Sequence, residues 1–235
     1  MPPRVLTLFG FASLLAVGCG PGARAPLYGS SPTVSTANYQ EVLTRWTRSD
    51  RIYYNFDTEL FATATLHTAE FRRAFAVTFP EIYGHGGNIT RRELVDLTGD
   101  VEQFHNFFVS VYTADDKWND LAQPDSIWHL TLIGSDSVAV DPAAIEIVKI
   151  DANLQQVYPY ISHFDKAYLV RFPLTDALNH LVLDPQSTSA TLHIASALGV
   201  AELVWQLQPA VNERTEPPAS NQVVPKAPVA LQLSK

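Results

Sequence analysis

The densest group of oxygen-bearing side chains in this chain runs from Asp115 to Asp120 and reads Asp-Asp-Lys-Trp-Asn-Asp. Calcium takes about six to eight oxygen ligands, and a loop between two strands of a sandwich can supply several of them. Asp115, Asp116 and Asp120 are therefore candidate calcium ligands, although their spacing is not that of an EF-hand. We favour a simpler interpretation, in which the Asp and Asn residues start turns and Trp118 docks the loop on the core.

The histidines show no spacing typical of a metal or catalytic site. No two are three to five residues apart, and the common cysteine-containing zinc patterns need more than the single cysteine present. His129 and His193 alternate with apolar neighbours, which predicts that both face solvent from a sheet. A metal or hydrolytic site would have to combine histidines that are distant in sequence: His67, His85, His105, His129, His163, His180 and His193.

A hydrolase is an alternative that the serine residues do not favour. The chain has no Gly-x-Ser-x-Gly motif around a nucleophile. The segment Gly84-His85-Gly86-Gly87 is similar to the oxyanion loop of esterases, but a helix end followed by a turn explains these glycines equally well. We therefore assign no catalytic residue from the sequence.

Aromatic residues provide candidate binding surfaces of two kinds. Exposed rings can bind sugars, and one short stretch holds five of them: Tyr158, Tyr160, Phe164, Tyr168 and Phe172. Tyr168 and Phe172 are an even number of residues apart on an expected strand, where packing in the core is the default. A second set has helical spacing and would receive a partner protein only if it were exposed: Phe71, Phe75 and Phe79.

The single cysteine, Cys19, directly follows an apolar segment at the N-terminus. Arg4 is the only charged residue among the first eighteen, and residues 5–17 form an uncharged, mostly apolar run of thirteen. A helix of this length reaches about 20 Å, short of the roughly 30 Å hydrocarbon core of a bilayer. These features predict an export signal peptide over residues 1–18 and not a membrane span.

The end of this segment, Leu15-Ala16-Val17-Gly18-Cys19, resembles the lipobox of bacterial lipoproteins. Ala16 stands where Leu is commoner, and Leu15 lies one position earlier. The resemblance covers the first nineteen residues; it implies a diacylglyceryl group on Cys19 and, in a Gram-negative host, an N-linked acyl chain such as palmitate. Gly20, where inner-membrane lipoproteins carry Asp, implies an outer-membrane protein that faces the periplasm. The globular part is similar to uncharacterised exported lipoproteins at residues 71–74 and 118–121, which implies no activity.

The composition predicts one folded domain between two linkers. Hydrophobic residues make up 46% of the 235 residues and charged residues 17%, as in globular proteins. We expect a lipidated cysteine and flexible tether over 19–34, a globular domain over 35–208 and a Pro-rich tail over 209–235. The net charge of −8 argues against nucleic acid as a partner and against a polybasic contact with lipid headgroups. Membrane contact is therefore expected through the lipid alone.

Hydrophobic periodicity predicts helices first and strands after residue 100. Three helices are expected: one over 39–46 behind the caps Ser35 and Thr36, one capped by Thr68 and ended by Gly84, and one opened by the capping box Thr90–Glu93. Strands are expected over 52–56, 60–66, 104–113, 127–133, 145–150, 168–172, 191–195 and 201–207, with a hairpin turn at 196–199. This pattern predicts a two-sheet antiparallel β-sandwich, Ig-like or C2-like, with the helices packed on it.

The leading functional hypothesis from the sequence is a membrane-anchored envelope lipoprotein without enzymatic activity. Such a protein would bind or scaffold another envelope component, either a protein or a glycan. The alternatives are a sandwich module that binds calcium or a glycan, and an unrecognised hydrolase. No cofactor is expected apart from the covalent lipid on Cys19, with calcium as the alternative ligand.

Overall fold

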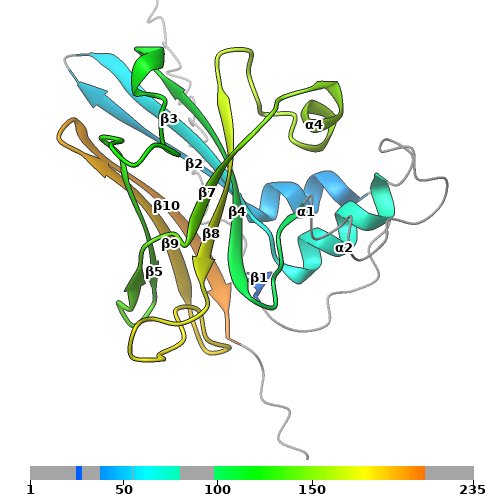
Figure 1. The fold of residues 1–235 in the computed structure, drawn as a ribbon. Coiled ribbons are helices and arrows are strands. Elements are labelled where there is room, and N and C mark those ends of the chain that lie inside the picture. Colours follow the sequence, from blue (N-terminus) through cyan, green and yellow to red (C-terminus); the bar gives the residue numbers. More distant parts are fainter. Residues whose placement is uncertain (1–24, 28–37, 55, 80–97, 210–235) are drawn as a thin grey trace, which may run out of the picture.

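The computed structural model describes residues 25–27, 38–54, 56–79 and 98–209, which form two β-sheets packed face to face (Figure 1). The first sheet has the strand order β2-β3-β4-β8-β7, and the second has the order β1-β10-β9-β5-β6. Neighbouring strands are antiparallel, except that β1 pairs with β10 in parallel over two residues. The expected antiparallel sandwich with helices packed on it is confirmed.

All eight expected strands are present, with ends shifted by a few residues. The strands are β1 (Ala25–Pro26), β2 (Thr47–Tyr54), β3 (Asp57–Leu66), β4 (Phe104–Thr113), β5 (His129–Gly134), β6 (Ala139–Val140), β7 (Ala144–Val148), β8 (Lys166–Pro173), β9 (Ser189–Ser196) and β10 (Gly199–Gln208). The helices are α1 (Tyr39–Trp46), α2 (Ala69–Thr78), the 3-10 turn η2 (Asp116–Trp118) and α4 (Ala152–Val157). The short elements β1, β6 and α4 were not predicted, because two or six residues are too few to show a period.

The first two helices begin and end for local reasons. Thr68 caps α2, since its hydroxyl accepts a hydrogen bond from the Phe71 backbone N–H at 3.1 Å. The expectation that this helix continues to Gly84 is wrong: α2 ends at Thr78, two residues before Pro80, whose ring cannot continue a helix. Helix α1 begins after Asn38, so the cap candidates Ser35 and Thr36 lie outside the described residues, as does the helix expected at Thr90.

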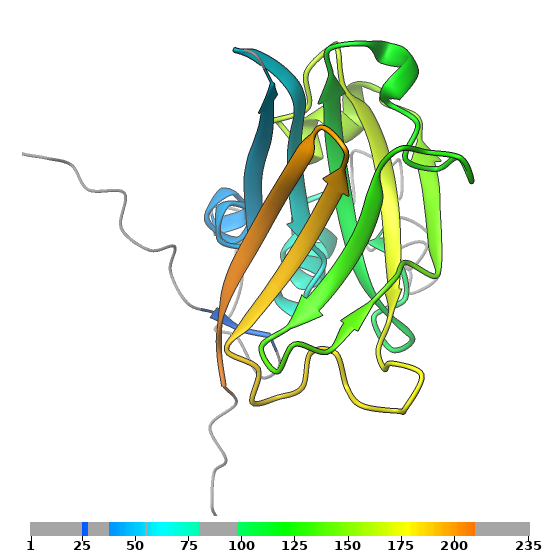
Figure 2. The same cartoon turned by 90° about the vertical axis from the view of Figure 1, so that its left-hand side faces the viewer.

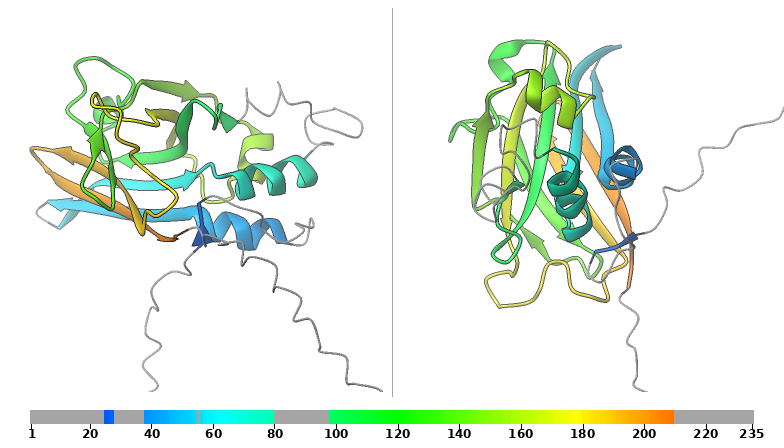
Figure 3. Two further views of the ribbon diagram at one scale, coloured as in Figure 1. Left: turned by 90° about the horizontal axis from the view of Figure 1, so that it is seen from below. Right: turned by 90° about the vertical axis from the view of Figure 1, so that its right-hand side faces the viewer.

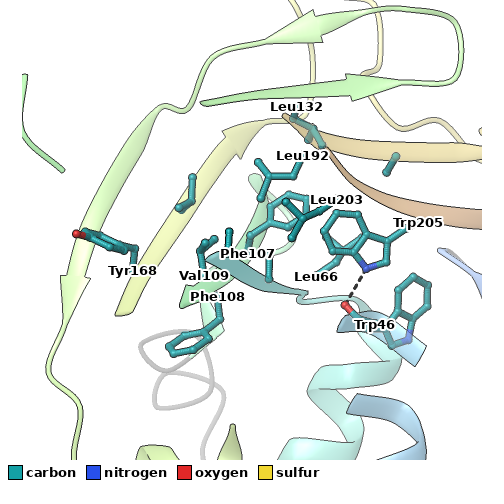
Figure 4. Close-up of a cluster of buried hydrophobic side chains, with 14 of the residues drawn as sticks. Trp46, Leu66, Phe107, Phe108, Val109, Leu132, Tyr168, Leu192, Leu203 and Trp205 are labelled. Atoms are coloured by element: carbon teal, nitrogen blue, oxygen red, sulfur yellow. Dashed lines mark hydrogen bonds between the residues drawn. The ribbon is translucent and has the colours of Figure 1, made fainter. Parts of the chain in front are cut away.

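Alternate residues of facing strands build the interior of the sandwich (Figure 4). Phe107 and Val109 of β4 meet Leu203 and Trp205 of β10, and all four are at most 1% exposed. The rings of Phe107 and Trp205 lie 5.4 Å apart. The indole N–H of Trp205 also donates to the Trp46 carbonyl oxygen at 2.8 Å, which joins β10 to the end of α1.

A second apolar layer covers part of the outer face of the first sheet, where α1, α2 and α4 lie (Figure 3). Phe108 of β4 stacks on Tyr158 with ring centroids 3.8 Å apart, and His67 stacks on Phe71 at 4.8 Å. Because both faces of the sheet are covered here, residues 62–66 of β3 are all buried instead of alternating. At the other end of β3 the outer face has no such cover, and Phe61 is only half-buried.

The two sheets also meet along one edge, where side chains of β2 contact the main chain of β10. The Asp50 carboxylate accepts a hydrogen bond from the Glu202 backbone N–H at 2.8 Å, and the Arg48 guanidinium donates to the Val204 carbonyl oxygen at 2.9 Å. Since β1 covers only the last two residues of β10, these two side chains satisfy main-chain groups that an edge strand would otherwise leave open.

The loops lie in two groups, one at each end of the long axis of the sandwich (Figure 2). One end carries the β2–β3 hairpin, the η2 segment and the β9–β10 turn, whose Gly199 lies against Ile52. The other end carries the β5–β6 turn, the β8–β9 loop, and β1 paired with the end of β10. Ala25 and Gln208 therefore lie together at the end opposite the β2–β3 hairpin, and part of the expected tether, Ala25–Pro26, is paired with the sheet.

Candidate functional site

Three aromatic side chains project into solvent at the β2–β3 hairpin. Tyr53 is 57% exposed, Tyr54 is 53% exposed, and Phe56 is fully exposed. We call these three residues the aromatic tip. They lie where the strands of the first sheet extend beyond the layer formed by the helices, so no other described element covers them. Single exposed apolar residues are normal on protein surfaces, but three large exposed rings within four consecutive residues are unusual and indicate a candidate interaction site.

The backbone at Phe56 has a conformation that side chains rarely adopt. Its φ is +74°, in the left-handed region that favours glycine. A non-glycine residue in this region costs about 1–2 kcal/mol. Because the ring is fully exposed, no burial in the described fold offsets this cost. The backbone conformation follows from the hairpin, because Tyr54 pairs with Asp57 and Phe56 is the second of the two loop residues, where positive φ is common. The turn does not require an aromatic side chain at this position, and packing in the described fold does not explain the exposed ring.

A row of three side chains continues from the tip across the first sheet. Arg51, Phe61 and Tyr112 are direct cross-strand neighbours on β2, β3 and β4. The Arg51 guanidinium lies 5.2 Å from the Phe61 ring centroid and 5.9 Å from that of Tyr53, and it donates to the Tyr53 hydroxyl at 3.0 Å. These cation–π contacts hold the arginine and the rings in a fixed arrangement.

This row forms the floor of a shallow pocket of about 630 Å³, which we call the tip pocket. Its lining combines aromatic and charged residues: Arg51, Phe56, Asp57, Thr58, Glu59, Phe61, Tyr112 and Ala114. Within the described part of the chain, the carboxylates of Asp57 and Glu59 have no hydrogen-bond or ion-pair partner. The volume lies in the range of roughly 300–1,000 Å³ found for small-molecule sites, and the pocket opens directly beside the aromatic tip.

The aromatic tip was not predicted from the sequence, although the residues around position 55 indicate it. The segment Tyr53-Tyr54-Asn55-Phe56, which lies within the expected strand over 52–56, places three aromatic residues around an Asn. Consecutive side chains of a strand point to opposite faces, so Tyr53 and Tyr54 could not both enter one core. Reading the segment as a turn with exposed rings would have identified the tip.

The candidate calcium ligands each have a separate partner. Asp115 pairs with the Lys117 ammonium at 2.8 Å, Asp116 pairs with Lys166 at 3.1 Å, and Asp120 accepts a hydrogen bond from the Ser126 hydroxyl at 2.8 Å. Hydrogen bonds from Lys117 lower the pKa of the Asp115 carboxyl. Among the described residues, no three His, Cys, Asp or Glu side chains are grouped to hold a metal ion.

The loop that carries these aspartates is anchored by two buried residues. Asn119 donates to the Val111 carbonyl oxygen at 2.6 Å, and its own side-chain oxygen accepts from the Tyr168 hydroxyl at 2.9 Å. Trp128 is buried and donates to the Trp118 carbonyl oxygen at 2.6 Å. The expectation that Trp118 docks the loop is wrong, because its side chain is 38% exposed and Trp128 fills the core instead.

Three histidines each lie close to one acid, and two of them, His129 and His193, are diagonal neighbours on the adjacent strands β5 and β9. His129 lies 3.2 Å from Asp141, His180 lies 3.1 Å from Asp176, and His193 lies 3.8 Å from Glu202. His129 is exposed as expected, whereas His193 is half-buried. None of the described histidines is hydrogen-bonded to a serine side chain, so these pairs form no nucleophile–base arrangement in the described ranges.

Two further histidines are buried within the fold. The Nδ1–H of His67 donates to the Thr98 carbonyl oxygen at 2.7 Å, and its Nε2 accepts from the Tyr158 hydroxyl at 2.8 Å. Desolvation lowers the pKa of His67 to about 4, and the charge of Arg72 adds to this effect, whereas the bond to Thr98 opposes it. Desolvation also lowers the pKa of His105 to about 4, and its Nε2 has no partner in the described structure. Both histidines are therefore neutral at pH 7.

The aromatic residues expected at a glycan or protein surface mostly lie inside the fold. Tyr158, Tyr168 and Phe172 are buried, Tyr160 is half-buried, and only Phe164 is exposed, at 77%. The helical stripe of Phe71, Phe75 and Phe79 is at most 5% exposed and packs within the domain, so it is not an open surface for a partner. Among the described residues, three exposed rings occur close together in sequence at the aromatic tip, whereas Phe164 and Trp118 are exposed singly.

Several predicted features lie outside the described residues. These are the signal peptide over 1–18, the lipidation site Cys19, the loop Gly84-His85-Gly86-Gly87 and the tail after residue 209. In the ranges that are described, no helix has both the length and the apolar composition to span a membrane. Comparison with known proteins finds no matching family, no similar curated protein and no similar solved structure.

Proposed function

We propose that this protein is a lipid-anchored, non-enzymatic binding protein of the bacterial cell envelope, and that the aromatic tip is its contact surface. The observation that carries the proposal is the full exposure of Phe56 beside the exposed Tyr53 and Tyr54, at a turn position that glycine would occupy without strain. Exposed aromatic rings lose unfavourable contact with water when a ligand covers them. Such residues are the usual energetic centre of a binding surface.

The position of the tip fits a protein that is anchored at its opposite end. Ala25 lies beside Leu207, at the end of the sandwich away from the β2–β3 hairpin. Only five residues separate Cys19 from Ala25, so a lipid on Cys19 would hold this end within about 20 Å of the bilayer surface. The ten residues of β10 add about 33 Å between that end and the opposite one. In the proposed arrangement the tip reaches away from the outer membrane into the periplasm.

Crosslinking in intact cells with a photoreactive diazirine reagent, which reacts with C–H and O–H bonds of proteins and glycans alike, tests this proposal. Three full-length proteins are compared: the wild type, Phe56→Gly at the tip and Leu178→Ala as a control. Leu178 is 74% exposed in the β8–β9 loop at the other end of the sandwich, so its change removes a similar exposed apolar group. We expect the same crosslinked product from the wild type and Leu178→Ala, and its loss in Phe56→Gly. Equal products from all three proteins would contradict a role for the tip.

A further inference from the structure

We infer that the ligand of the aromatic tip is an uncharged saccharide chain that lies in the tip pocket, an inference that rests on the proposed function. The pocket presents ring faces and hydrogen-bonding groups side by side. Phe61 and Tyr112 form neighbouring positions of one row, and Phe56 stands at the rim. The C–H groups of a sugar ring pack on aromatic faces, while the hydroxyl groups around its edge remain free for polar contacts.

The lining of the pocket carries charges of both signs, so a ligand of either sign meets at least one like charge there. Arg51 lies in the floor of the pocket and would repel a cation, while Asp57 and Glu59 in the same lining would repel an anion. An apolar chain is also a poor fit, because it would desolvate these three charged groups without replacing their hydrogen bonds. The pocket is therefore complementary to a neutral, polar molecule.

The hydrogen-bonding groups narrow this class to a molecule rich in hydroxyls. The carboxylates of Asp57 and Glu59 only accept hydrogen bonds and have no partner in the described ranges, whereas the Arg51 guanidinium only donates. A hydroxyl group both donates and accepts, so neighbouring hydroxyls of one sugar can serve both kinds of side chain. The pocket is shallow and continues to the exposed tip, which suits a chain that passes across the surface and not a single enclosed sugar.

Isothermal titration of the purified lipidated protein in detergent micelles tests the inference. Two neutral tetrasaccharides serve as probes, one of β-1,4-linked N-acetylglucosamine and one of β-1,4-linked glucose. We expect saturable binding of at least one of them, and the preferred probe separates an acetamido-sugar chain from a plain glucan as the source of the ligand. An acidic tetrasaccharide and a tetralysine peptide are the charged comparisons, and we expect neither to bind.

Variants in the pocket locate the binding. Phe56→Gly and Asp57→Asn should each raise the dissociation constant of the preferred tetrasaccharide at least tenfold, and Leu178→Ala should leave it within twofold. Absence of binding to both neutral probes, or tighter binding of a charged probe, would overturn the saccharide inference. If the tip nevertheless crosslinks in cells, the proposed function stands and only the ligand class is wrong. If tip-dependent crosslinking is also absent, both fail.

Discussion

At the residue scale, replacement of Phe56 by glycine would have two opposing effects on the free energy of unfolding. The ring makes no buried contact in the described fold, and its φ of +74° is unfavourable for any residue with a Cβ. Glycine would remove this strain but would also increase the conformational freedom of the unfolded chain. The two effects are of similar size, so this position can be changed with little effect on folding.

We therefore predict that Phe56→Gly leaves the free energy of unfolding within about 1 kcal/mol of the wild type while binding is lost. Urea denaturation followed by tryptophan fluorescence measures the free energy. Phe107→Ala is the comparison, since Phe107 is fully buried and its loss should cost about 3–5 kcal/mol. Strong destabilisation by Phe56→Gly would show that the ring supports the fold and would remove the main argument for a binding role.

The two buried histidines make stability depend on pH. Each has a pKa of about 4 in the folded protein, whereas a histidine in an unfolded chain has a pKa of about 6.5. Between these values the unfolded state binds a proton at each position and the folded state does not. Above about pH 6.5 these histidines therefore do not reduce the free energy of unfolding. As the pH decreases toward 4, the free energy of unfolding falls by up to about 1.4 kcal/mol per pH unit for each histidine.

Replacement of each histidine should separate the two contributions. His105→Leu removes a buried nitrogen without a partner, so we predict stability at pH 7 at least equal to that of the wild type and a shallower decline at lower pH. His67→Leu also removes a titrating group, but it leaves the Thr98 carbonyl and the Tyr158 hydroxyl without their bonds to the ring, so stability at pH 7 should fall by about 1–3 kcal/mol. Urea denaturation at several pH values measures both effects. An unchanged pH dependence in His105→Leu would contradict this account.

At the element scale, the contact between β2 and β10 closes one edge of the sandwich. We predict that the double change Arg48→Ala and Asp50→Ala lowers the free energy of unfolding by about 1–3 kcal/mol, since two main-chain groups of β10 lose their partners. The opened edge should also cause concentration-dependent self-association. Denaturation and light scattering measure the two results, with Glu41→Ala on the exposed face of α1 as the control. A monomer of unchanged stability would show that the edge needs no such cover.

Strand β4 and the β2–β3 hairpin show which parts of this fold can be predicted from the sequence. The run of aromatic and β-branched residues over 104–113 predicted β4 with both of its ends, although residues 105–111 are all buried because both faces of this strand are covered. The hairpin of β2 and β3 was predicted only as two strands, and the exposure of Tyr53 was not predicted. Aromatic residues favour strands whether or not another layer covers them, so their exposure depends on where α1 and α2 pack. That placement rests on contacts such as the bond from the Trp46 indole N–H to the buried Glu70 carboxylate, which join residues distant in sequence.

At the scale of the whole molecule, the proposed lipid anchor and the proposed binding surface lie at opposite ends of the sandwich. The lipid on Cys19 remains a prediction from the lipobox resemblance. We predict that cells grown with radioactive palmitate label the wild-type protein and not Cys19→Ala. Because Cys19 is the only cysteine, any label remaining in Cys19→Ala would contradict lipidation at this residue. Phe56→Gly is the matched control and should be labelled as strongly as the wild type.

Binding of an envelope component by the aromatic tip is tested most directly without the lipid. Residues 20–235 are mixed with purified envelopes over a range of concentrations, and bound protein is measured after sedimentation. Since the lipid is absent, retention depends on the folded domain. We predict saturable binding that is weakened at least tenfold in Phe56→Gly and unchanged in Leu178→Ala. No saturable binding, or equal binding of all three proteins, would contradict binding by the tip.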